Sequence, residues 1–173
     1  DSVTRAGDTL GPDHPSTLAS RNNLAGAYRD AGRLDEAIAL YEQILEDRTR
    51  ILGPHHPSTL TSRNNLAYAY QDAGRLNDAI TLYEQNLKDL EGLLGPDHPD
   101  TLTSRHNLAY AYQDAGRLND AITLYEQNLK DLEGLLGPDH PDTLTSRHNL
   151  AYAYQDAGRL NDAITLYEQN LKD

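Results

Sequence analysis

Apolar residues recur along the chain at the spacing of one face of a helix. One such set is Leu102, Leu108, Ala109, Tyr112 and Ala115. This spacing predicts an amphipathic α-helix, which we call helix A. Gly116 follows at the position where a residue in the left-handed conformation commonly ends a helix, so helix A is predicted to stop there.

A second apolar stripe begins a few residues later and predicts a second helix, helix B. Its positions are Ala121, Ile122, Tyr125, Leu129 and Leu132. Asn119 is expected to cap the N terminus of helix B by accepting a backbone hydrogen bond. Asp120 suits the positive end of the helix dipole, and Gly137 and Pro138 end the helix.

This pair of helices is repeated along the chain. The motif Gly-Pro-x-His-Pro begins every 42 residues, at Gly11, Gly53, Gly95 and Gly137. Units are predicted at residues 11–52, 53–94, 95–136 and 137–173, the last truncated, with residues 1–10 as the end of a truncated preceding repeat. One hairpin buries too little apolar surface alone, so neighbouring units must cover its stripes. The expected fold is all-α, as one repeat domain over residues 1–173.

Several residues of each unit carry a resemblance to a known family. In the third unit they are Leu108, Ala109, Tyr112, Gly116, Ala121 and Tyr125. Their spacing resembles the tetratricopeptide repeat (TPR), and the unit length is similar to the 42-residue variant of kinesin light chains and bacterial signal-transduction NTPase sensors. The resemblance implies a right-handed superhelical solenoid of antiparallel helix hairpins. Arg105 and Asn128 depart from the family pattern, which has apolar residues at those positions.

Composition excludes several classes of function. The formal net charge is −12, which leaves no basic surface for nucleic acid or anionic membranes. The chain has no cysteine, which excludes disulfides and a cysteine nucleophile and fits a cytoplasmic location. No phosphate-binding loop, nucleophile elbow or HExxH motif occurs. We therefore expect neither an enzyme nor a bound cofactor.

The resemblance places a concave binding groove along the A helices, and in the third unit the implied groove positions include Thr103. Across the chain, the candidate peptide-binding residues are Asn22, Asn23, Arg29, Asn64, Asn65, Tyr68, Gln71, Thr103, His106, Asn107, Tyr110, Gln113, His148, Asn149 and Tyr152. Differences between units add to this assignment, because those inside helix A form one stripe. Its positions are Ala19/Thr61, Asn64/His106, Gly26/Tyr68 and Arg29/Gln71. Either these differences tune binding, or they are unconstrained changes at an exposed surface.

An asparagine recurs at one helix A position, and a tyrosine recurs three residues later. The asparagines are Asn23, Asn65, Asn107 and Asn149. Their amides could hold the backbone of an extended peptide, or each could tie its helix to the adjoining repeat. Tyr68, Tyr110 and Tyr152 could add contact surface or line the seam between repeats.

The expected partner is a neutral or basic protein or peptide. TPR proteins that clamp C-terminal carboxylates have lysines in the groove, whereas the lysines here, Lys88, Lys130 and Lys172, lie on helix B. Anion binding is left open by Arg29 and by the arginine row, Arg63, Arg105 and Arg147. We expect instead that the stems of these arginines cover apolar surface.

Histidines recur in the linker before each helix A, at His14, His56, His98 and His140. Pro141 is tolerated only in the first turn of a helix, so that helix A is predicted to begin between Asp139 and Asp142. The histidines are either residues of the helix start or ligands of a metal, and we favour the helix start because tight metal sites need several converging ligands.

The function expected from these features is a non-catalytic scaffold for protein–protein interaction that binds a peptide in the groove. The alternative is a structural repeat array without a dedicated ligand, in which near-identical units stack head to tail or exchange between chains. Uncapped ends would then make the chain a homo-oligomer.

Overall fold

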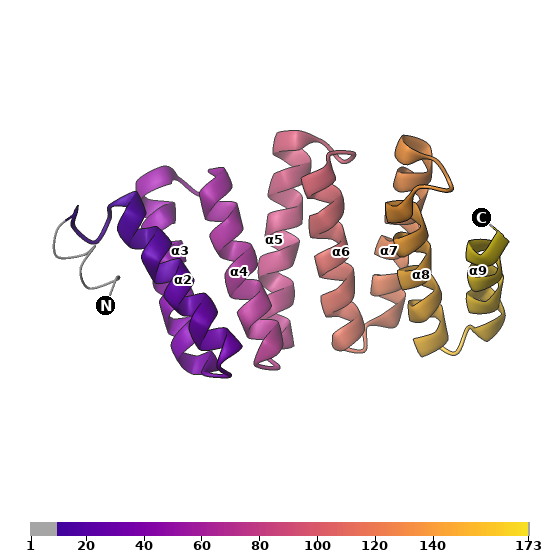
Figure 1. The fold of residues 1–173 in the computed structure, drawn as a ribbon, viewed down its shortest axis with the longest axis horizontal. Helices are drawn as coiled ribbons and strands as arrows, with labels where there is room; N and C mark the ends of the chain where they lie inside the picture. The colour runs from indigo at the N-terminus through magenta and orange to yellow at the C-terminus, as the bar shows by residue number, and fades with distance from the viewer. Residues whose placement is uncertain (1–9, 173) are drawn as a thin grey trace. The chain divides into compact units, whose positions relative to one another are not determined.

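The computed structural model describes residues 10–172, and this part of the chain contains eight helices and no strand. They are α2 (Pro15–Asp30), α3 (Leu34–Leu52), α4 (Pro57–Asp72), α5 (Leu76–Leu94), α6 (Pro99–Asp114), α7 (Leu118–Leu136), α8 (Pro141–Asp156) and α9 (Leu160–Lys172) (Figure 1). The predicted end of a preceding repeat, residues 1–10, lies outside the described residues except for Leu10.

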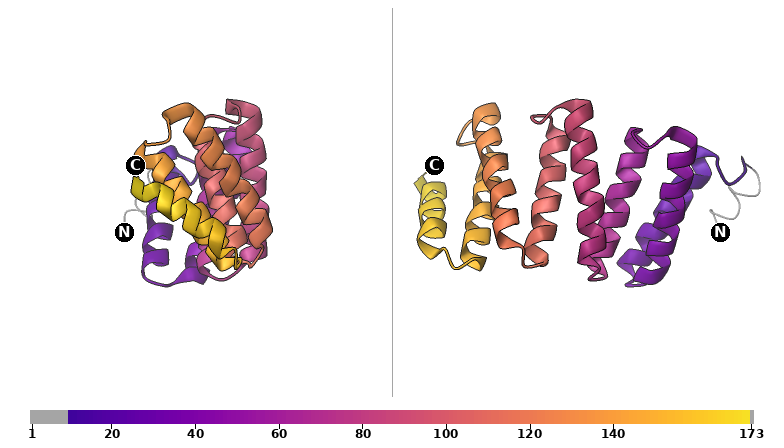
Figure 2. Two further views of the ribbon diagram at one scale, coloured as in Figure 1. Left: turned by 90° about the vertical axis from the view of Figure 1, so that its right-hand side faces the viewer. Right: turned by 180° about the vertical axis from the view of Figure 1, so that it is seen from behind.

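The helices fall into two compact units that are larger than the 42-residue repeats. Unit 1 is Asp1–Asn86 and unit 2 is Leu87–Asp173. Within each unit, successive helices run antiparallel, as the orange and yellow helices near the C terminus show in the view from behind (Figure 2). In unit 1, α3 packs against α2 and α4, and in unit 2, α7 packs against α6 and α8. Each of these B helices is therefore covered by its own A helix and by the next.

Each A helix begins at a proline that follows a histidine. The His140 ring accepts a hydrogen bond at Nδ1 from the backbone N–H of Asp142, at 3.1 Å, and the equivalent bonds at His14, His56 and His98 are 3.1, 3.0 and 3.1 Å long. The imidazole thus satisfies one of the N–H groups that a helix start leaves without a partner. The predicted start of this helix and the favoured role of the linker histidines are both confirmed.

The turn between the helices of a pair is closed by a glycine. Gly116 has a φ of 75°, its N–H donates to the Gln113 carbonyl at 3.0 Å, and the Arg117 N–H donates to the Tyr112 carbonyl at 2.8 Å. These two bonds form a Schellman motif, which confirms the predicted end of helix A.

The predicted cap of helix B is wrong. The N-cap residue of α7 is Arg117, without a side-chain cap, and Asn119 lies inside the helix. The Schellman turn leaves Arg117 at the helix boundary, so α7 starts before Asn119. The Arg117 side chain instead donates from Nε to Asp120 Oδ2 at 2.9 Å, and its guanidinium lies over the Tyr112 ring, 4.4 Å from the centroid.

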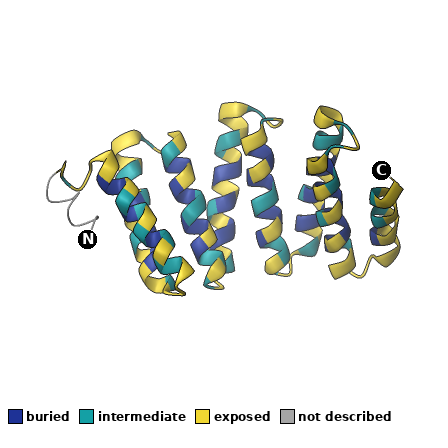
Figure 3. Cartoon of the chain, viewed as in Figure 1, coloured by how far each residue is buried: buried dark blue, intermediate teal, exposed yellow. Residues whose placement is uncertain are grey.

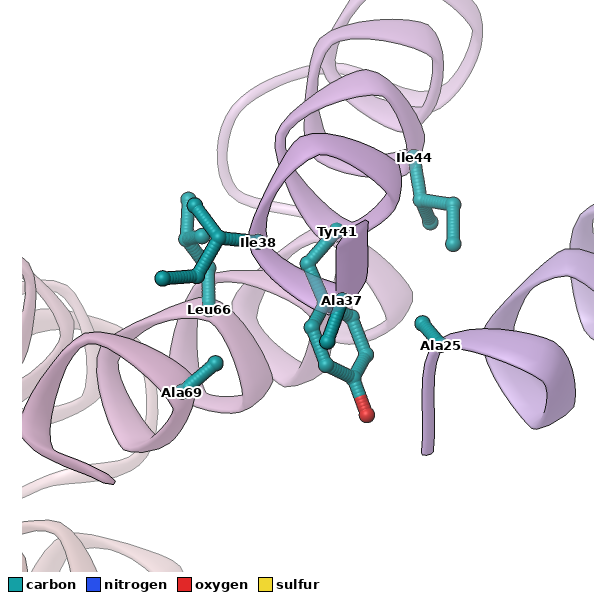
Figure 4. Close-up of a cluster of buried hydrophobic side chains, with 7 residues drawn as sticks. All are labelled: Ala25, Ala37, Ile38, Tyr41, Ile44, Leu66 and Ala69. Carbon is teal, nitrogen blue, oxygen red and sulfur yellow. The ribbon is translucent and has the colours of Figure 1, made fainter. Parts of the chain in front are cut away.

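Small residues bring the helices close together, and one large aromatic ring fills the space between them. In unit 1, the α3 side chains of Ala37, Ile38, Tyr41 and Ile44 lie between Ala25 of α2 and Leu66 and Ala69 of α4 (Figure 4). Unit 2 has an equivalent cluster around Tyr125, which is 1% exposed. Buried residues accordingly follow one face of each central helix (Figure 3).

Arg105 is completely buried, which corrects the expectation for the arginine row. Its guanidinium donates to Asn128 Oδ1 at 3.0 Å, to Asp131 Oδ2 at 2.7 Å and to the Pro96 carbonyl at 3.2 Å. A buried charge is costly unless it is paired and hydrogen-bonded, so the head of this side chain points inward to these acceptors rather than outward to solvent. Arg63 and Arg147 make the corresponding contacts with Asn86 and Asn170, both at 2.9 Å.

Arg105 and Asn128, the two residues that depart from the TPR pattern, are therefore hydrogen-bonded to each other. Asn128 accepts from Arg105 and donates from Nδ2 to the Leu102 carbonyl at 2.9 Å, so both ends of its buried amide are satisfied. The first repeat has Ile44 at the asparagine position, and there Arg21 pairs with Asp47 at 2.7 Å. A polar network thus joins the linker, helix A and helix B of one repeat.

Candidate peptide-binding site

All the candidate residues of the A helices are at least partly exposed. Tyr68, Tyr110 and Tyr152 are 46%, 50% and 52% exposed, so about half of each ring surface is open to solvent. In unit 1 the candidates lie on α2 and α4, and in unit 2 on α6 and α8. Within each unit, the candidate residues are therefore polar and aromatic side chains that are at least partly exposed on the A helices.

Residues of the stripe also connect adjacent repeats. In unit 2, Gln113 donates from Nε2 to Asp156 Oδ2 at 2.6 Å and accepts from the Tyr125 hydroxyl at 3.3 Å. In unit 1 the same position is Arg29, whose Nε lies 3.9 Å from Asp72 Oδ2. The Arg29 guanidinium also lies 4.8 Å from the centroid of the Tyr68 ring. The difference between units therefore exchanges an ion pair for a hydrogen bond from a neutral amide to a carboxylate.

The asparagine row takes part in contacts between repeats as well. Asn65 of α4 donates from Nδ2 to Asn22 Oδ1 of α2 at 3.2 Å. For Asn65 the structure shows the contact expected of a residue that ties its helix to the adjoining repeat. Binding of a peptide by this row stays a prediction.

A cavity of about 500 Å³ opens between α6, the end of α7 and the start of α8 in unit 2. Its lining includes the predicted residues Thr103, His106 and Asn149. The rest of the lining is Asp97, Pro99, Leu102, Asn128, Leu132, Leu135, Leu136, His140, Asp142, Thr145 and Ser146. Asn128 and Ser146 are 4% and 7% exposed, whereas Leu135 is 51% exposed, so the cavity extends from buried polar groups to an open apolar edge.

The part of the lining that comes from helix B and the linker was not predicted from the sequence. Binding was assigned to helix A alone, which left out Leu132, Leu135 and Leu136 of α7. Leu135 and Leu136 come directly before Gly137, beyond the predicted stripe of helix B. Two exposed leucines at the end of an otherwise amphipathic helix were the signal that would have identified them.

The cavity is acidic at neutral pH. Burial lowers the pKa of His106 below its ordinary value, so this imidazole is neutral at pH 7. Its ring stacks at a tilt on Tyr125, with the ring centroids 5.8 Å apart, and burial raises the pKa of the Tyr125 hydroxyl. The carboxylates in the lining are Asp97 and Asp142, and both are exposed.

Two other kinds of feature do not occur in the described part of the chain. Within residues 10–172, no group of three or more histidine, aspartate or glutamate side chains is arranged to hold a metal ion. None of the described helices combines the length and the apolarity needed to cross a bilayer.

The sequence profile of the tetratricopeptide repeat family matches residues 2–48, 16–88, 60–130 and 106–172. The chain belongs to the tetratricopeptide repeat family. Together with the eight described helices, this match confirms the all-α TPR fold expected from the sequence. Over 38 residues, which are 22% of this TPR chain, it is 53% identical to Protein KINESIN LIGHT CHAIN-RELATED 2 of Arabidopsis thaliana. The matched stretch spans only 6% of that relative.

Solved structures show the same architecture. The putative kinesin light chain of Podosopora anserina with nearly identical TPR-like repeats is 39% identical to this TPR chain, with a TM-score of 0.90 over 98% of this chain and 81% of that one. A variant of the same Podosopora anserina protein gives a TM-score of 0.90 at 38% identity, over 98% of this chain and 80% of the other. BtubC (BKLC) from P. vanneervenii shares the fold at 22% identity, with a TM-score of 0.81 over 98% and 68% of the two chains.

Proposed function

We propose that the chain is a non-catalytic interaction module that binds a neutral or basic segment of a partner protein along its A helices. The observation that carries this proposal is the cavity of about 500 Å³ in unit 2, a volume typical of ligand sites. It joins three of the candidate residues, Thr103, His106 and Asn149, to an apolar edge. Such a combination of apolar area and a few polar groups is typical of sites that bind a partner's side chains.

The partner's charge and location follow from the composition. The net charge of −12 favours a neutral or basic partner over nucleic acid or an anionic membrane. The absence of cysteine supports a cytoplasmic site of action. Within unit 2, the other candidate residues of α6 and α8 would provide further contacts for the same partner.

A peptide selection tests this function. The chain is used to select binders from a library of displayed peptides, and the affinities of synthetic copies are measured by fluorescence anisotropy. We expect Thr103→Trp, which fills the cavity, to weaken binding at least about tenfold by excluding the peptide side chain. Gln127→Trp is the matched control, since Gln127 is exposed on α7 and does not line the cavity. Failure to select any peptide, or equal affinity for both variants, would contradict the proposal.

A second candidate function is self-association through α9. Ile164 and Leu171 are 51% and 87% exposed, whereas the equivalent residues of α7, Ile122 and Leu129, are 3% and 8% exposed because α8 covers them. The apolar face of α9 has the same residues as the face of α7 that α8 covers, so a helix pair of a second copy could pack on it in the same way. Light scattering across a concentration series tests this. We expect the mass to rise with concentration in the parent and to stay monomeric in Ile164→Glu, and a monomeric parent would refute it.

A further inference from the structure

Repeats 1 and 3 differ at several positions near the end of helix B, and at two of these positions repeat 1 has an arginine that repeat 3 lacks. Arg48 and Arg50 of α3 correspond to Leu132 and Gly134 of α7, which lie 84 residues later. Repeat 3 therefore lacks two cationic side chains that repeat 1 possesses. Among the residues that line the cavity of unit 2, Asp97, His140 and Ser146 have identical counterparts in unit 1. Other lining residues differ: Thr103, His106, Asn128, Leu135 and Asp142 correspond to Ala19, Asn22, Ile44, Ile51 and Ser58.

In unit 1, Arg48 supplies a guanidinium to this place from within the chain. Its Nη1 donates to Ser62 Oγ at 2.8 Å and to the Ser58 carbonyl at 3.4 Å. Burial lowers the pKa of Arg48, as it does for a cation withdrawn from water. The residues equivalent to Ser62 and Ser58 in unit 2 are Ser146 and Asp142, and both line the cavity.

Unit 2 keeps the equivalent acceptors, the Ser146 hydroxyl and the Asp142 carbonyl, but has Leu132 in place of Arg48. Ser146 is 7% exposed, and among the described residues its hydroxyl forms no hydrogen bond. Position 142 carries a carboxylate where unit 1 has Ser58, which adds a negative charge beside the same backbone carbonyl. The Ser146 hydroxyl lines the open cavity and is not among the buried atoms that lack a partner, so it can accept a hydrogen bond from a donor that enters there.

Arg50 is the second arginine that repeat 3 lacks, and in unit 1 it pairs with Asp13 of the linker. In unit 1, Arg50 donates from Nη2 to Asp13 Oδ1 at 2.8 Å, and this hydrogen bond holds the pKa of Asp13 below its ordinary value. The equivalent carboxylate in unit 2 is Asp97, and Gly134 stands in place of the arginine. Within residues 10–172, Asp97 has no ion pair, so its charge also faces the cavity without compensation.

We propose that the cavity of unit 2 binds an arginine side chain of a basic partner peptide, in the manner in which unit 1 holds its own Arg48. The guanidinium donates to Ser146 Oγ and to the carbonyl and carboxylate of Asp142, and Asp97 supplies the second negative charge. The stem packs on Leu102 and Leu132. A guanidinium suits this site better than an ammonium because its planar fork donates to several acceptors at once. This proposal rests on the proposed function and names the ligand chemistry of its site.

The test uses the peptides selected above, each synthesised with every arginine replaced in turn by citrulline, its neutral isostere, or by lysine. We expect one citrulline replacement to weaken binding at least about tenfold and the lysine replacement to recover only part of the loss. Equal affinity of the arginine and citrulline peptides, with Thr103→Trp still abolishing binding, would overturn the arginine assignment and leave the proposed function standing. No binding by any peptide would instead reject the proposed function.

Variants that exchange the two repeats provide the matched controls. Leu132→Arg places in unit 2 the residue that unit 1 already accommodates, so we expect it to fold and to weaken peptide binding at least about tenfold by filling the cavity. Asp142→Asn and Asp97→Asn should each weaken binding of the arginine peptide about threefold or more, and leave the citrulline peptide unchanged. Unimpaired binding to a folded Leu132→Arg chain would overturn the proposal.

Two further experiments ask whether the site binds free arginine as well as a peptide, and whether repeat 1 can be given the same site. Free arginine is titrated by calorimetry, and an affinity equal to that of the peptide would contradict a peptide site. Arg48→Leu with Arg50→Gly converts repeat 1 to the sequence of repeat 3 at these positions and should add a second binding site for the arginine peptide. A stoichiometry unchanged from that of the parent would overturn the equivalence of the two places.

Discussion

Arg105 Nη1 lies 3.0 Å from Asn128 Oδ1, and both residues are buried within one repeat. The pair joins helix A to helix B and, through the Pro96 carbonyl, to the preceding linker. Because the guanidinium keeps its charge at every accessible pH, the network must hold it in the interior.

Removal of the guanidinium should be strongly destabilising. Arg105→Met leaves Asn128 Oδ1, the Pro96 carbonyl and Asp131 without their donor, and we expect a loss of about 3–5 kcal/mol. Asn128→Ile, which copies the residue of repeat 1, should cost about 1–3 kcal/mol by leaving the Leu102 carbonyl unsatisfied. Urea denaturation followed by circular dichroism measures both.

The double variant Arg105→Met with Asn128→Ile distinguishes a coupled pair from two independent residues. We expect its loss to be smaller than the sum of the single losses, since neither partner is left buried alone. Arg33→Met is the control, because Arg33 is exposed and pairs with Glu36 at the surface, and it should change stability by less than about 1 kcal/mol. Strict additivity in the double variant would contradict the coupling.

The histidine caps can be tested by exchange of one side chain. His140→Ala removes the acceptor for the Asp142 N–H and should lower the free energy of unfolding by about 0.5–2 kcal/mol. His140→Asn restores a good N-cap acceptor and should recover most of the loss. Thermal melts that rank alanine equal to asparagine would argue that the ring acts through packing instead.

The raised pKa of Tyr154 predicts how the free energy of unfolding changes at alkaline pH. Burial, with a hydrogen bond to Glu126, raises the pKa of its hydroxyl to about 12. In the unfolded chain the pKa of tyrosine is about 10, so the unfolded state ionises first as the pH rises. The stabilisation from Tyr154 is complete below about pH 10 and is lost as the pH approaches 12. Unfolding monitored from about pH 8 to about pH 12 should show a weaker alkaline loss in Tyr154→Phe than in the parent.

The replacement of Arg29 in unit 1 by glutamine, the residue at the same position in unit 2, should have little effect on stability. Arg29→Gln gives unit 1 the residue of unit 2, and the 3.9 Å contact with the partly exposed Asp72 is lost. We expect a change of less than about 1 kcal/mol that becomes smaller in high salt. A larger loss that salt does not reduce would assign Arg29 a role in packing, through its contact with Tyr68.

Most of the fold follows from local patterns in the sequence. The apolar stripes, Gly116 and Pro141 depend on helix geometry and backbone freedom, so they predict the helices, their ends and the core around Tyr125. Asn119 was assigned incorrectly because cap preference is a statistical tendency, and the geometry of the Schellman turn overrides it. The inward direction of Arg105 depends on acceptors from Pro96 and Asp131, which only the folded chain brings together.

The candidate site was predicted only in part for a similar reason. Thr103, His106 and Asn149 could be found because they lie on one face of helix A. The contribution of Leu132 and Asp97 depends on how the end of one helix pair meets the start of the next. The comparison of Arg48 with Leu132 was already present in the sequence, but its meaning required the hydrogen bonds of Arg48.

The network around Arg105 joins the linker, the first helix and the second helix of a repeat by hydrogen bonds within that repeat, and it adds a longer contact of 3.8 Å to Glu91 of the preceding repeat. When the chain is stretched from its ends, each repeat should therefore unfold as one cooperative segment. Release of one 42-residue repeat would lengthen the chain by roughly 140 Å. Extension would then proceed in steps of equal length, one for each complete repeat that keeps its arginine.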